Sequence, residues 1–288
     1  MGIFITMITE NDLHLGNGSQ LHIYDSGIAG PSTLNLFWLH GTPSTGALPV
    51  RLLNSSQHLS IRWISFDRPG YGSSTPNPNR TVVSTANYVA QIADSLQINR
   101  FAVLGYSGGG PYALACGALL PDRVFGIASV SGPAPLSADG LDWFQNMTVV
   151  NADEFKAARA GRITLERYLQ TATPEPEMFA PIDLAALAGE WSWFVNVVDL
   201  ALQSGTHGQI DDDLALVTDW GFSLTKIAVP TLLLHGLDDQ LVPSAHANWL
   251  ARHIPRADLR LYPSQGHISI LNFGQTALTW LRQLADEA

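Results

Sequence analysis

The chain contains 288 residues, of which 46% are hydrophobic and 14% are charged, and its formal net charge at pH 7 is −10. That length allows one domain with a sizeable core and an insertion, and the negative charge argues against nucleic-acid or anionic-membrane partners. The single cysteine excludes an intrachain disulfide framework, and no run approaches the roughly 20 apolar residues of a transmembrane helix. Residues 1–6 lack the basic start of a signal peptide, so the cytoplasm is the expected location.

Strand and helix patterns alternate through the first 130 residues. Residues 13–24 predict a hairpin with the glycine turn Gly16-Asn17-Gly18. Apolar runs predict further strands at 34–39, 61–66, 100–104 and 124–130, and the helices between them include 81–96. Such alternation is typical of an α/β protein whose mostly parallel sheet is covered by helices on both faces.

The turn between a predicted strand at 101–104 and a predicted helix at 111–120 reads Gly105-Tyr106-Ser107-Gly108-Gly109. Glycines two positions before and after Ser107 let the strand and helix backbones approach without a Cβ clash. Such a turn projects the serine hydroxyl out of the sheet, over a helix N-terminus, as in the G-x-S-x-G nucleophile elbow. From this pentapeptide alone, a tight structural turn or a phosphate-binding loop is the alternative interpretation.

The alternation stops between about residue 133 and residue 225, where the sequence looks helical and carries no clear strand. This stretch contains four of the eight tryptophans, namely Trp143, Trp191, Trp193 and Trp220. Its run Asp211-Asp212-Asp213 predicts a helix N-terminus or a solvated turn, with binding of an amine-bearing substrate as the alternative role.

The strand pattern returns at 229–235 and is followed by a loop that contains Asp238 and Asp239. A carboxylate there lies at the carboxyl end of a strand, where open α/β sheets bind ligands. A later loop contains His267, and the order Ser107, Asp239, His267 is one of the three known orders of the serine–histidine–aspartate triad. The remaining predicted elements are a helix at 244–254, a strand at 258–262 and a closing amphipathic helix at 271–284.

Five motifs in this order resemble those of α/β-hydrolase-fold serine hydrolases of the esterase-like kind with a helical cap. They are H-G-x-P at 40–43, D-x-x-G-x-G-x-S at 67–74, G-x-S-x-G at 105–109, H-G-x-x-D-x-x-V-P at 235–243 and G-H at 266–267. The resemblance implies a sheet of about eight strands, a catalytic core formed by residues 1–133 and 226–288, and an inserted helical cap at 134–225.

The resemblance also implies a role for each site residue. Ser107 is the expected nucleophile and His267 the base that takes its proton, because a serine hydroxyl is a weak nucleophile at neutral pH. Asp239 is the expected acid that orients the imidazole; Asp238 is its rival, and the spacing of the motif favours Asp239. The backbone N–H groups of Thr42 and Gly108 are the expected oxyanion-hole donors.

In the resembled family the cap lies over the active site and shapes substrate choice. Trp143, Trp191, Trp193 and Trp220 are therefore candidates to line the substrate pocket, although aromatic residues in a helical cap more often form its own core.

Together these residues predict a carboxylesterase-like serine hydrolase (EC 3.1.1) that cleaves a small or medium carboxylic ester through an acyl-enzyme, without a metal or another cofactor. Hydrolysis of a C–C, amide or lactone bond on the same triad stays open, because the fold and triad permit each of them. A non-catalytic ligand-binding protein of the same fold is a further alternative. The expected partner is a small-molecule substrate, not a nucleic acid or a membrane, and the sequence leaves monomer and homodimer open.

Overall fold

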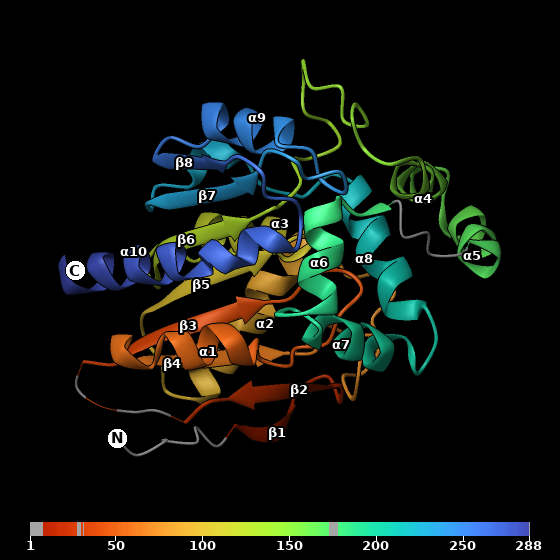
Figure 1. Ribbon diagram of the computed structural model, residues 1–288. Helices are drawn as coiled ribbons and strands as arrows, with labels where there is room; N and C mark the ends of the chain where they lie inside the picture. Colours follow the sequence, from red (N-terminus) through yellow and green to blue (C-terminus); the bar gives the residue numbers. More distant parts are fainter. Residues whose placement is uncertain (1–7, 28–29, 31, 173–177, 288) are drawn as a thin grey trace.

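In the computed structural model of the protein, the described residues are 8–27, 30, 32–172 and 178–287. They form an eight-stranded sheet with the strand order β1-β2-β4-β3-β5-β6-β7-β8 (Figure 1). β1 and β2 pair antiparallel, β2 pairs antiparallel with β4, and the remaining pairs are parallel. The predicted hairpin and the predicted mostly parallel sheet are thus confirmed. The strands are β1 (Thr9–His14), β2 (Gln20–Asp25), β3 (Leu34–Leu39), β4 (Ile61–Phe66), β5 (Phe101–Tyr106), β6 (Val124–Val130), β7 (Thr231–Gly236) and β8 (Ala257–Tyr262).

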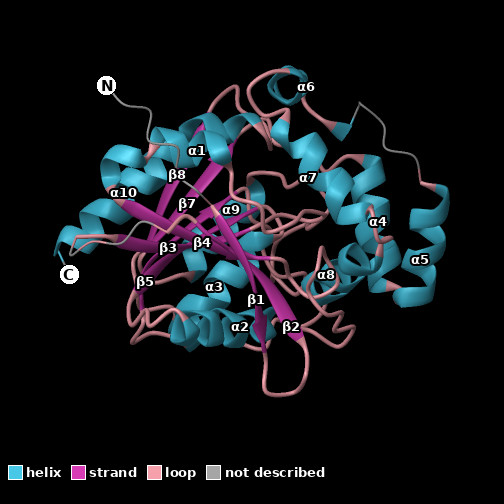
Figure 2. Cartoon of the chain, turned by 90° about the horizontal axis from the view of Figure 1, so that it is seen from below, coloured by secondary structure: helices cyan, strands magenta, loops and turns pink. Residues whose placement is uncertain are grey.

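Helices cover both faces of the sheet, as the alternating pattern predicted. Figure 2 shows α1 (Val50–Ser55) and α10 (Gly274–Glu287) on one side of the strands, with α2 (Val82–Ser95) and α3 (Gly109–Leu119) on the other. Residues of α9 (Ala245–His253) pack into the same core as those of α2 and α3. Every residue of β5 is buried, because a parallel strand between two helical layers exposes neither face to water.

Alternate residues of the central strand enter the two cores. Phe101 and Val103 pack with residues of α2 and α3, whereas Ala102 and Leu104 pack with residues of α1 and α10. This alternation follows from the strand's two-residue period. It makes β5 a rigid base for the turn that follows it.

The chain between β6 and β7, which we call the helical segment, contains α4 (Val149–Arg159), α5 (Arg162–Thr171), α6 (Pro181–Ala188), α7 (Trp193–Leu202) and α8 (His207–Val217). No strand occurs in the described part of it. Figure 1 shows these helices gathered beyond the carboxyl ends of the parallel strands. The boundaries predicted for the insertion, 134 and 225, stay a prediction.

The solvated turn predicted for Asp211-Asp212-Asp213 is wrong. All three residues are buried, and they lie within α8 instead of at its start. Their partners are distant in sequence: Asp211 pairs with Arg162, and Asp212 pairs with Arg68 and Arg80. A run of aspartates is expected at the surface only when no positively charged side chains pack against it.

None of the helices in the described residues is both long and apolar enough to cross a membrane. The same residues contain no group of three or more histidine, cysteine, aspartate or glutamate side chains that could hold a metal ion.

Candidate active site

The turn between β5 and α3 holds Ser107 in the left-handed backbone region, with a φ of 53°. A Cβ on Gly105 would lie 2.3 Å from the carbonyl oxygen of Gly109, and one on Gly109 would lie 2.0 Å from that of Leu39. Because a side chain at either position would overlap backbone atoms, only glycine allows this close approach of strand and helix. The G-x-S-x-G pattern therefore has a steric cause here, and the turn places Ser107 at the carboxyl end of β5.

Asp239 follows the carboxyl end of β7, and its side chain is completely buried. Its Oδ1 accepts the backbone N–H groups of Leu241 and Val242, at 3.0 and 2.9 Å. Burial by itself would raise the pKa of Asp239, but His267 and His235 outweigh this effect and hold that pKa well below its ordinary value. Asp239 is thus a charged acceptor at neutral pH.

His267 lies between the carboxylate and the serine. Its Nδ1 is 2.8 Å from Asp239 Oδ2, and its Nε2 is 2.8 Å from Ser107 Oγ. A carboxylate can only accept, so Nδ1 carries the proton and Nε2 of the neutral ring is free to accept the Ser107 hydroxyl. The structure therefore brings the three predicted residues together, whereas the rival Asp238 is exposed to solvent.

Two opposing effects set the pKa of His267. Burial lowers it, and the negative charge of Asp239 raises it, with a smaller raising contribution from Asp183. The balance places the pKa of His267 above its ordinary value of 6.5. A proton on the imidazole is therefore stabilised, as a base that must accept one during catalysis requires.

Asp183, which was not predicted from the sequence, fixes the loop that contains His267. This buried residue of α6 accepts three consecutive backbone N–H groups, those of His267, Ile268 and Ser269, at 2.7, 2.9 and 2.8 Å. A Cβ on Gly266 would lie 2.2 Å from Asp183 Oδ2, so the glycine before the histidine permits this contact. The sequence feature that could have indicated the role of Asp183 is that it is the one carboxylate in an otherwise apolar helix.

The two predicted oxyanion donors lie against each other beside the serine. A Cβ on Gly108 would lie 2.5 Å from Thr42 Oγ1 and 3.5 Å from the Thr42 nitrogen, and one on Gly41 would lie 3.3 Å from Ser107 Cβ. Within the described residues, no protein group accepts a hydrogen bond from the N–H of Thr42 or of Gly108. Both groups can therefore donate to a bound substrate, and their function as an oxyanion hole stays a prediction.

Three of the four tryptophans named as pocket candidates are buried. Trp143 packs among aromatic residues of the helical segment, Trp220 belongs to the core around α2 and α3, and Trp191 lies beside Phe194. Trp193 is partly buried and packs edge-on against Phe194. The indole N–H groups of Trp143, Trp191 and Trp220 donate to the Ala134 carbonyl, Asn272 Oδ1 and the Leu216 carbonyl, respectively. This burial favours packing roles, and contact with a substrate stays a prediction.

Known proteins share both the sequence pattern and the fold. A family model described as the alpha/beta hydrolase fold matches residues 35–273. The pimeloyl-[acyl-carrier protein] methyl ester esterase of Nitrosomonas europaea is 28% identical over 260 residues, which cover 88% of this chain and 95% of that protein. A 2-hydroxy-6-oxononadienedioate/2-hydroxy-6-oxononatrienedioate hydrolase of Cupriavidus pinatubonensis is 25% identical over 282 residues, covering 86% and 84%. The structure of a thermophilic esterase from Thermogutta terrifontis matches with a TM-score of 0.69 at 19% identity, over 96% of this chain and 99% of that one.

Proposed function

Because this chain belongs to the alpha/beta hydrolase fold family, we propose that it is a serine hydrolase that cleaves a small or medium carboxylic ester through an acyl-enzyme. The observation that carries this proposal is the hydrogen-bonded series from Ser107 through His267 to Asp239, with both contacts at 2.8 Å. The similarity to a methyl ester esterase over 88% of the chain supports the ester as the bond.

In the acylation step, Ser107 Oγ attacks the ester carbonyl carbon while His267 Nε2 takes the hydroxyl proton. Asp239 holds the ring in the required tautomer and stabilises the imidazolium that forms. The carbonyl oxygen becomes an oxyanion, and the N–H groups of Thr42 and Gly108 donate to it. Loss of one such donor typically costs about a hundredfold or more in rate.

The tetrahedral intermediate then collapses, and the C–O bond to the alcohol breaks. His267 gives its proton to the departing alcohol oxygen, and the acyl group stays on Ser107. In the second half, His267 takes a proton from a water molecule that attacks the acyl carbon, and it returns the proton to Ser107 Oγ. The products are the carboxylic acid and the alcohol, and the enzyme returns to its starting state.

We assign residues 134–225, which lie within the helical segment, the role of a cap over this site. Its helices lie beyond the carboxyl ends of the parallel strands (Figure 1), where ligands bind in open α/β sheets. Of the four candidate tryptophans, Trp193 is the one that is only partly buried, and it is the one we retain as a candidate to line the substrate pocket. The proposed partner is a small-molecule substrate, and the proposed location is the cytoplasm.

A second candidate function is hydrolysis of a bond other than an ester by the same residues. The relative from Cupriavidus pinatubonensis is named for a 2-hydroxy-6-oxo dienedioate, a compound without an ester group. In ester hydrolysis and in hydrolysis of such a compound alike, the enzyme attacks a carbonyl group, and the two reactions differ in the group that leaves. Amide and lactone hydrolysis belong to the same alternative.

Hydrolysis of p-nitrophenyl esters from acetate to decanoate tests the proposal, with the wild type and Ser107→Ala measured in parallel. Turnover that depends on Ser107 and peaks at one chain length supports the esterase and gives the size of its acyl site. Turnover no higher than that of Ser107→Ala rejects the ester, and a chromogenic C–C substrate, an amide and a lactone are then compared. Binding of a ligand without turnover of any of them would identify a non-catalytic binding protein.

A further inference from the structure

The peptide unit that contains the N–H of Thr42 is fixed through its carbonyl oxygen. That oxygen, on Gly41, accepts hydrogen bonds from Arg68 Nη2 at 2.7 Å and from His40 Nδ1 at 2.8 Å. His40 Nε2 accepts the backbone N–H of Arg68 at 3.2 Å, which places the ring proton on Nδ1. In a planar trans peptide the C=O and N–H bonds point in opposite directions. Fixing the Gly41 oxygen therefore sets the direction of the Thr42 N–H.

One of the two donors to this oxygen is charged. The Arg68 side chain is buried, and its guanidinium also donates to the His40 carbonyl at 2.5 Å and to Thr42 Oγ1 at 3.1 Å. A charged donor in a low-dielectric site polarises the peptide group that accepts from it. The N–H on the far side of the Gly41–Thr42 peptide thereby becomes a stronger donor.

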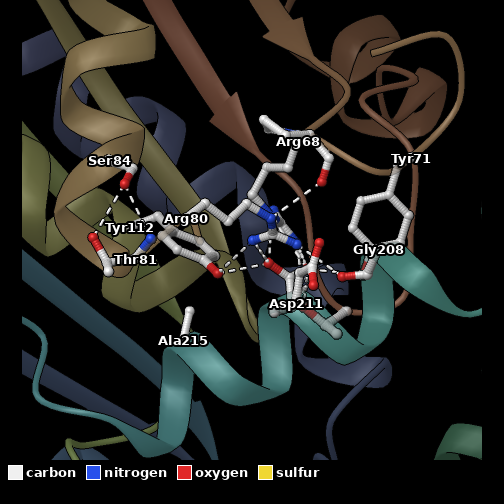
Figure 3. Close-up of polar contacts among 12 residues, drawn as sticks. Arg68, Tyr71, Arg80, Thr81, Ser84, Tyr112, Gly208, Asp211 and Ala215 are labelled. Atoms are coloured by element: carbon white, nitrogen blue, oxygen red, sulfur yellow. Dashed lines mark hydrogen bonds and ion pairs between the residues drawn. The ribbon is translucent and has the colours of Figure 1, made fainter. Parts of the chain in front are cut away.

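A carboxylate from the helical segment holds this guanidinium in place. Asp212 of α8 has a completely buried side chain and accepts from Arg68 Nε and Nη2, at 3.0 and 2.6 Å. Asp212 also accepts the Thr42 hydroxyl at 2.8 Å, the hydroxyls of Tyr71 and Tyr112 at 2.8 and 2.6 Å, and Arg80. Figure 3 shows Arg68, Arg80 and Tyr112 converging on α8.

Asp212 is charged at neutral pH. Burial by itself would raise the pKa of Asp212, but the guanidiniums of Arg68 and Arg80 outweigh burial and hold that pKa well below its ordinary value. Because a buried polar network whose members are all hydrogen-bonded is rigid, this carboxylate holds Arg68 and Thr42 in place together.

We propose that Arg68 and Asp212 are positioning residues for the oxyanion hole: Asp212 fixes the Arg68 guanidinium and the Thr42 hydroxyl, and Arg68 aims and polarises the Thr42 N–H. This inference rests on the proposed serine-hydrolase function. It gives the helical segment a contribution to the rate of the chemical step that is separate from any contact with substrate.

Arg80 provides a matched control. It is as buried as Arg68 and pairs with the same Asp212, so its replacement perturbs the same network. Its other partners are the carbonyls of Pro69 and Gly208 and the Tyr112 hydroxyl, and it has no hydrogen bond to residues 40–42. If the network is purely structural, Arg68→Lys and Arg80→Lys should lower kcat equally. If Arg68 positions the oxyanion hole, Arg68→Lys should lower kcat more.

The experiment measures kcat and KM on the best p-nitrophenyl ester for the wild type, Ser107→Ala, Arg68→Lys and Arg80→Lys, with the melting temperature of each. We expect Arg68→Lys to lower kcat about 10- to 100-fold, up to the loss typical of one oxyanion donor, with KM changed less than about twofold because ground-state binding is kept. The acid limb of its pH profile stays that of the wild type, since His267 and Asp239 are untouched. Arg80→Lys should lower kcat clearly less than Arg68→Lys, even with an equal fall in melting temperature, because Arg80 has no hydrogen bond to residues 40–42.

Inhibition by a trifluoromethyl ketone gives a second readout for the same variants. Ser107 Oγ adds to the ketone carbon, the hydroxyl proton passes to His267, and the charged hemiketal oxygen occupies the oxyanion hole. Because this adduct imitates the transition state, its inhibition constant rises in Arg68→Lys by the same factor by which kcat/KM falls.

Thr42→Val and Thr42→Ser test the hydroxyl contacts of Thr42 with Asp212 and Arg68 without replacing an arginine. Valine keeps the shape and the backbone N–H of Thr42 but cannot donate to Asp212, whereas serine keeps the hydroxyl. We expect Thr42→Val to lower kcat about tenfold and Thr42→Ser to keep most of the wild-type kcat, because serine retains the hydroxyl that donates to Asp212 and accepts from Arg68. This pair decides the question even when Arg68→Lys does not fold.

The possible outcomes separate this inference from the proposed function. No Ser107-dependent turnover in the wild type overturns the function itself, before any arginine variant is considered. Wild-type turnover with equal effects of Arg68→Lys and Arg80→Lys, or with Thr42→Val as active as Thr42→Ser, overturns the positioning role. The expected split between the two arginines and between the two Thr42 variants supports it.

Discussion

The imidazole of His267 makes two different hydrogen bonds, and each has a separate consequence. Its Nδ1 donates to the buried carboxylate of Asp239, which sets the tautomer, and its Nε2 faces Ser107 Oγ. Proton transfer between Ser107 and His267 needs both residues, because His267 is the one base that contacts the Ser107 hydroxyl among the residues that the structure describes. We therefore treat the two residues as one functional unit.

Ser107→Ala and His267→Ala should each reduce kcat/KM to near the background rate, about 10⁴-fold or more below the wild type, and the double variant should lose little beyond either one. The measurement is ester hydrolysis by all three variants with the substrate that the wild type prefers. A double variant that loses the product of the two single losses would show that the residues act independently.

Asp239 and Asp238 are adjacent carboxylates in different environments, and they form a natural pair for substitution. Asp239→Asn keeps the size of the side chain but allows the wrong tautomer of His267, and it should lower kcat about 10⁴-fold. Asp238 is exposed, so Asp238→Asn should change kcat less than about twofold. Steady-state kinetics of the two variants decide the assignment, which is wrong if Asp238→Asn is the more damaging change.

The pH dependence of kcat/KM follows from the raised pKa of His267. A base must be unprotonated to act, so activity falls as the pH drops through that pKa. Because Asp239 raises the pKa above the ordinary value of 6.5, the acid limb should have its midpoint above pH 6.5. A pH–rate profile from pH 5 to 9 in buffers of constant ionic strength measures it, and a midpoint below 6.5 would contradict the direction of the shift.

Two helices of the helical segment each send one buried carboxylate to a loop of the core. Asp183 of α6 accepts three N–H groups of the loop that contains His267. Asp212 of α8 accepts from Thr42, in the loop that follows β3, and from Arg68, in the loop that follows β4. These contacts link the helical segment to the proposed base and to the proposed oxyanion donor.

Asp183→Asn should show whether α6 acts on His267. The amide lacks the negative charge that raises the pKa of His267, so we expect the acid limb to move to lower pH. The amide also keeps only one acceptor oxygen, so the loop that positions the base loses hydrogen bonds, and we expect kcat to fall about tenfold. Asp199→Asn on α7 is the control, since it removes the same charge at an exposed position of the same segment. A loss of thermal stability with an unmoved acid limb would mean that Asp183 only supports the loop.

The sequence predicted those features of the structure that depend on residues close together in the chain. The glycines around Ser107 were informative because a Cβ there would overlap backbone atoms of the adjoining helix or strand, and the predicted helix at 81–96 appears as α2, Val82–Ser95. Asp183 and Asp212 were not predictable in the same way. Their partners lie 84 to 170 positions away in the sequence. The residues next to a carboxylate in a helix do not indicate which distant side chains or loops will pack against it.

At the scale of the molecule, the sheet and the helical segment share a buried ionic contact. One carboxylate, Asp212, faces two guanidiniums from the core, and the side chains of all three are at most 2% exposed. Such a cluster adds little stability over apolar packing, but removal of one member leaves an unpaired buried charge. We therefore expect the helical segment and the sheet to unfold together.

Urea unfolding of Asp212→Asn tests this coupling. In the wild type, tryptophan fluorescence and far-UV circular dichroism should change in one coincident transition, because half of the tryptophans lie in the helical segment and half lie outside it. Asp212→Asn leaves the guanidiniums of Arg68 and Arg80 without their buried counter-charge, and it should lower the free energy of unfolding by about 3–5 kcal/mol. The exposed Asp199→Asn should change that free energy by less than about 0.5 kcal/mol. A loss below about 1 kcal/mol in Asp212→Asn, in the range of an exposed ion pair, would mean that contacts other than this cluster join the helical segment to the sheet.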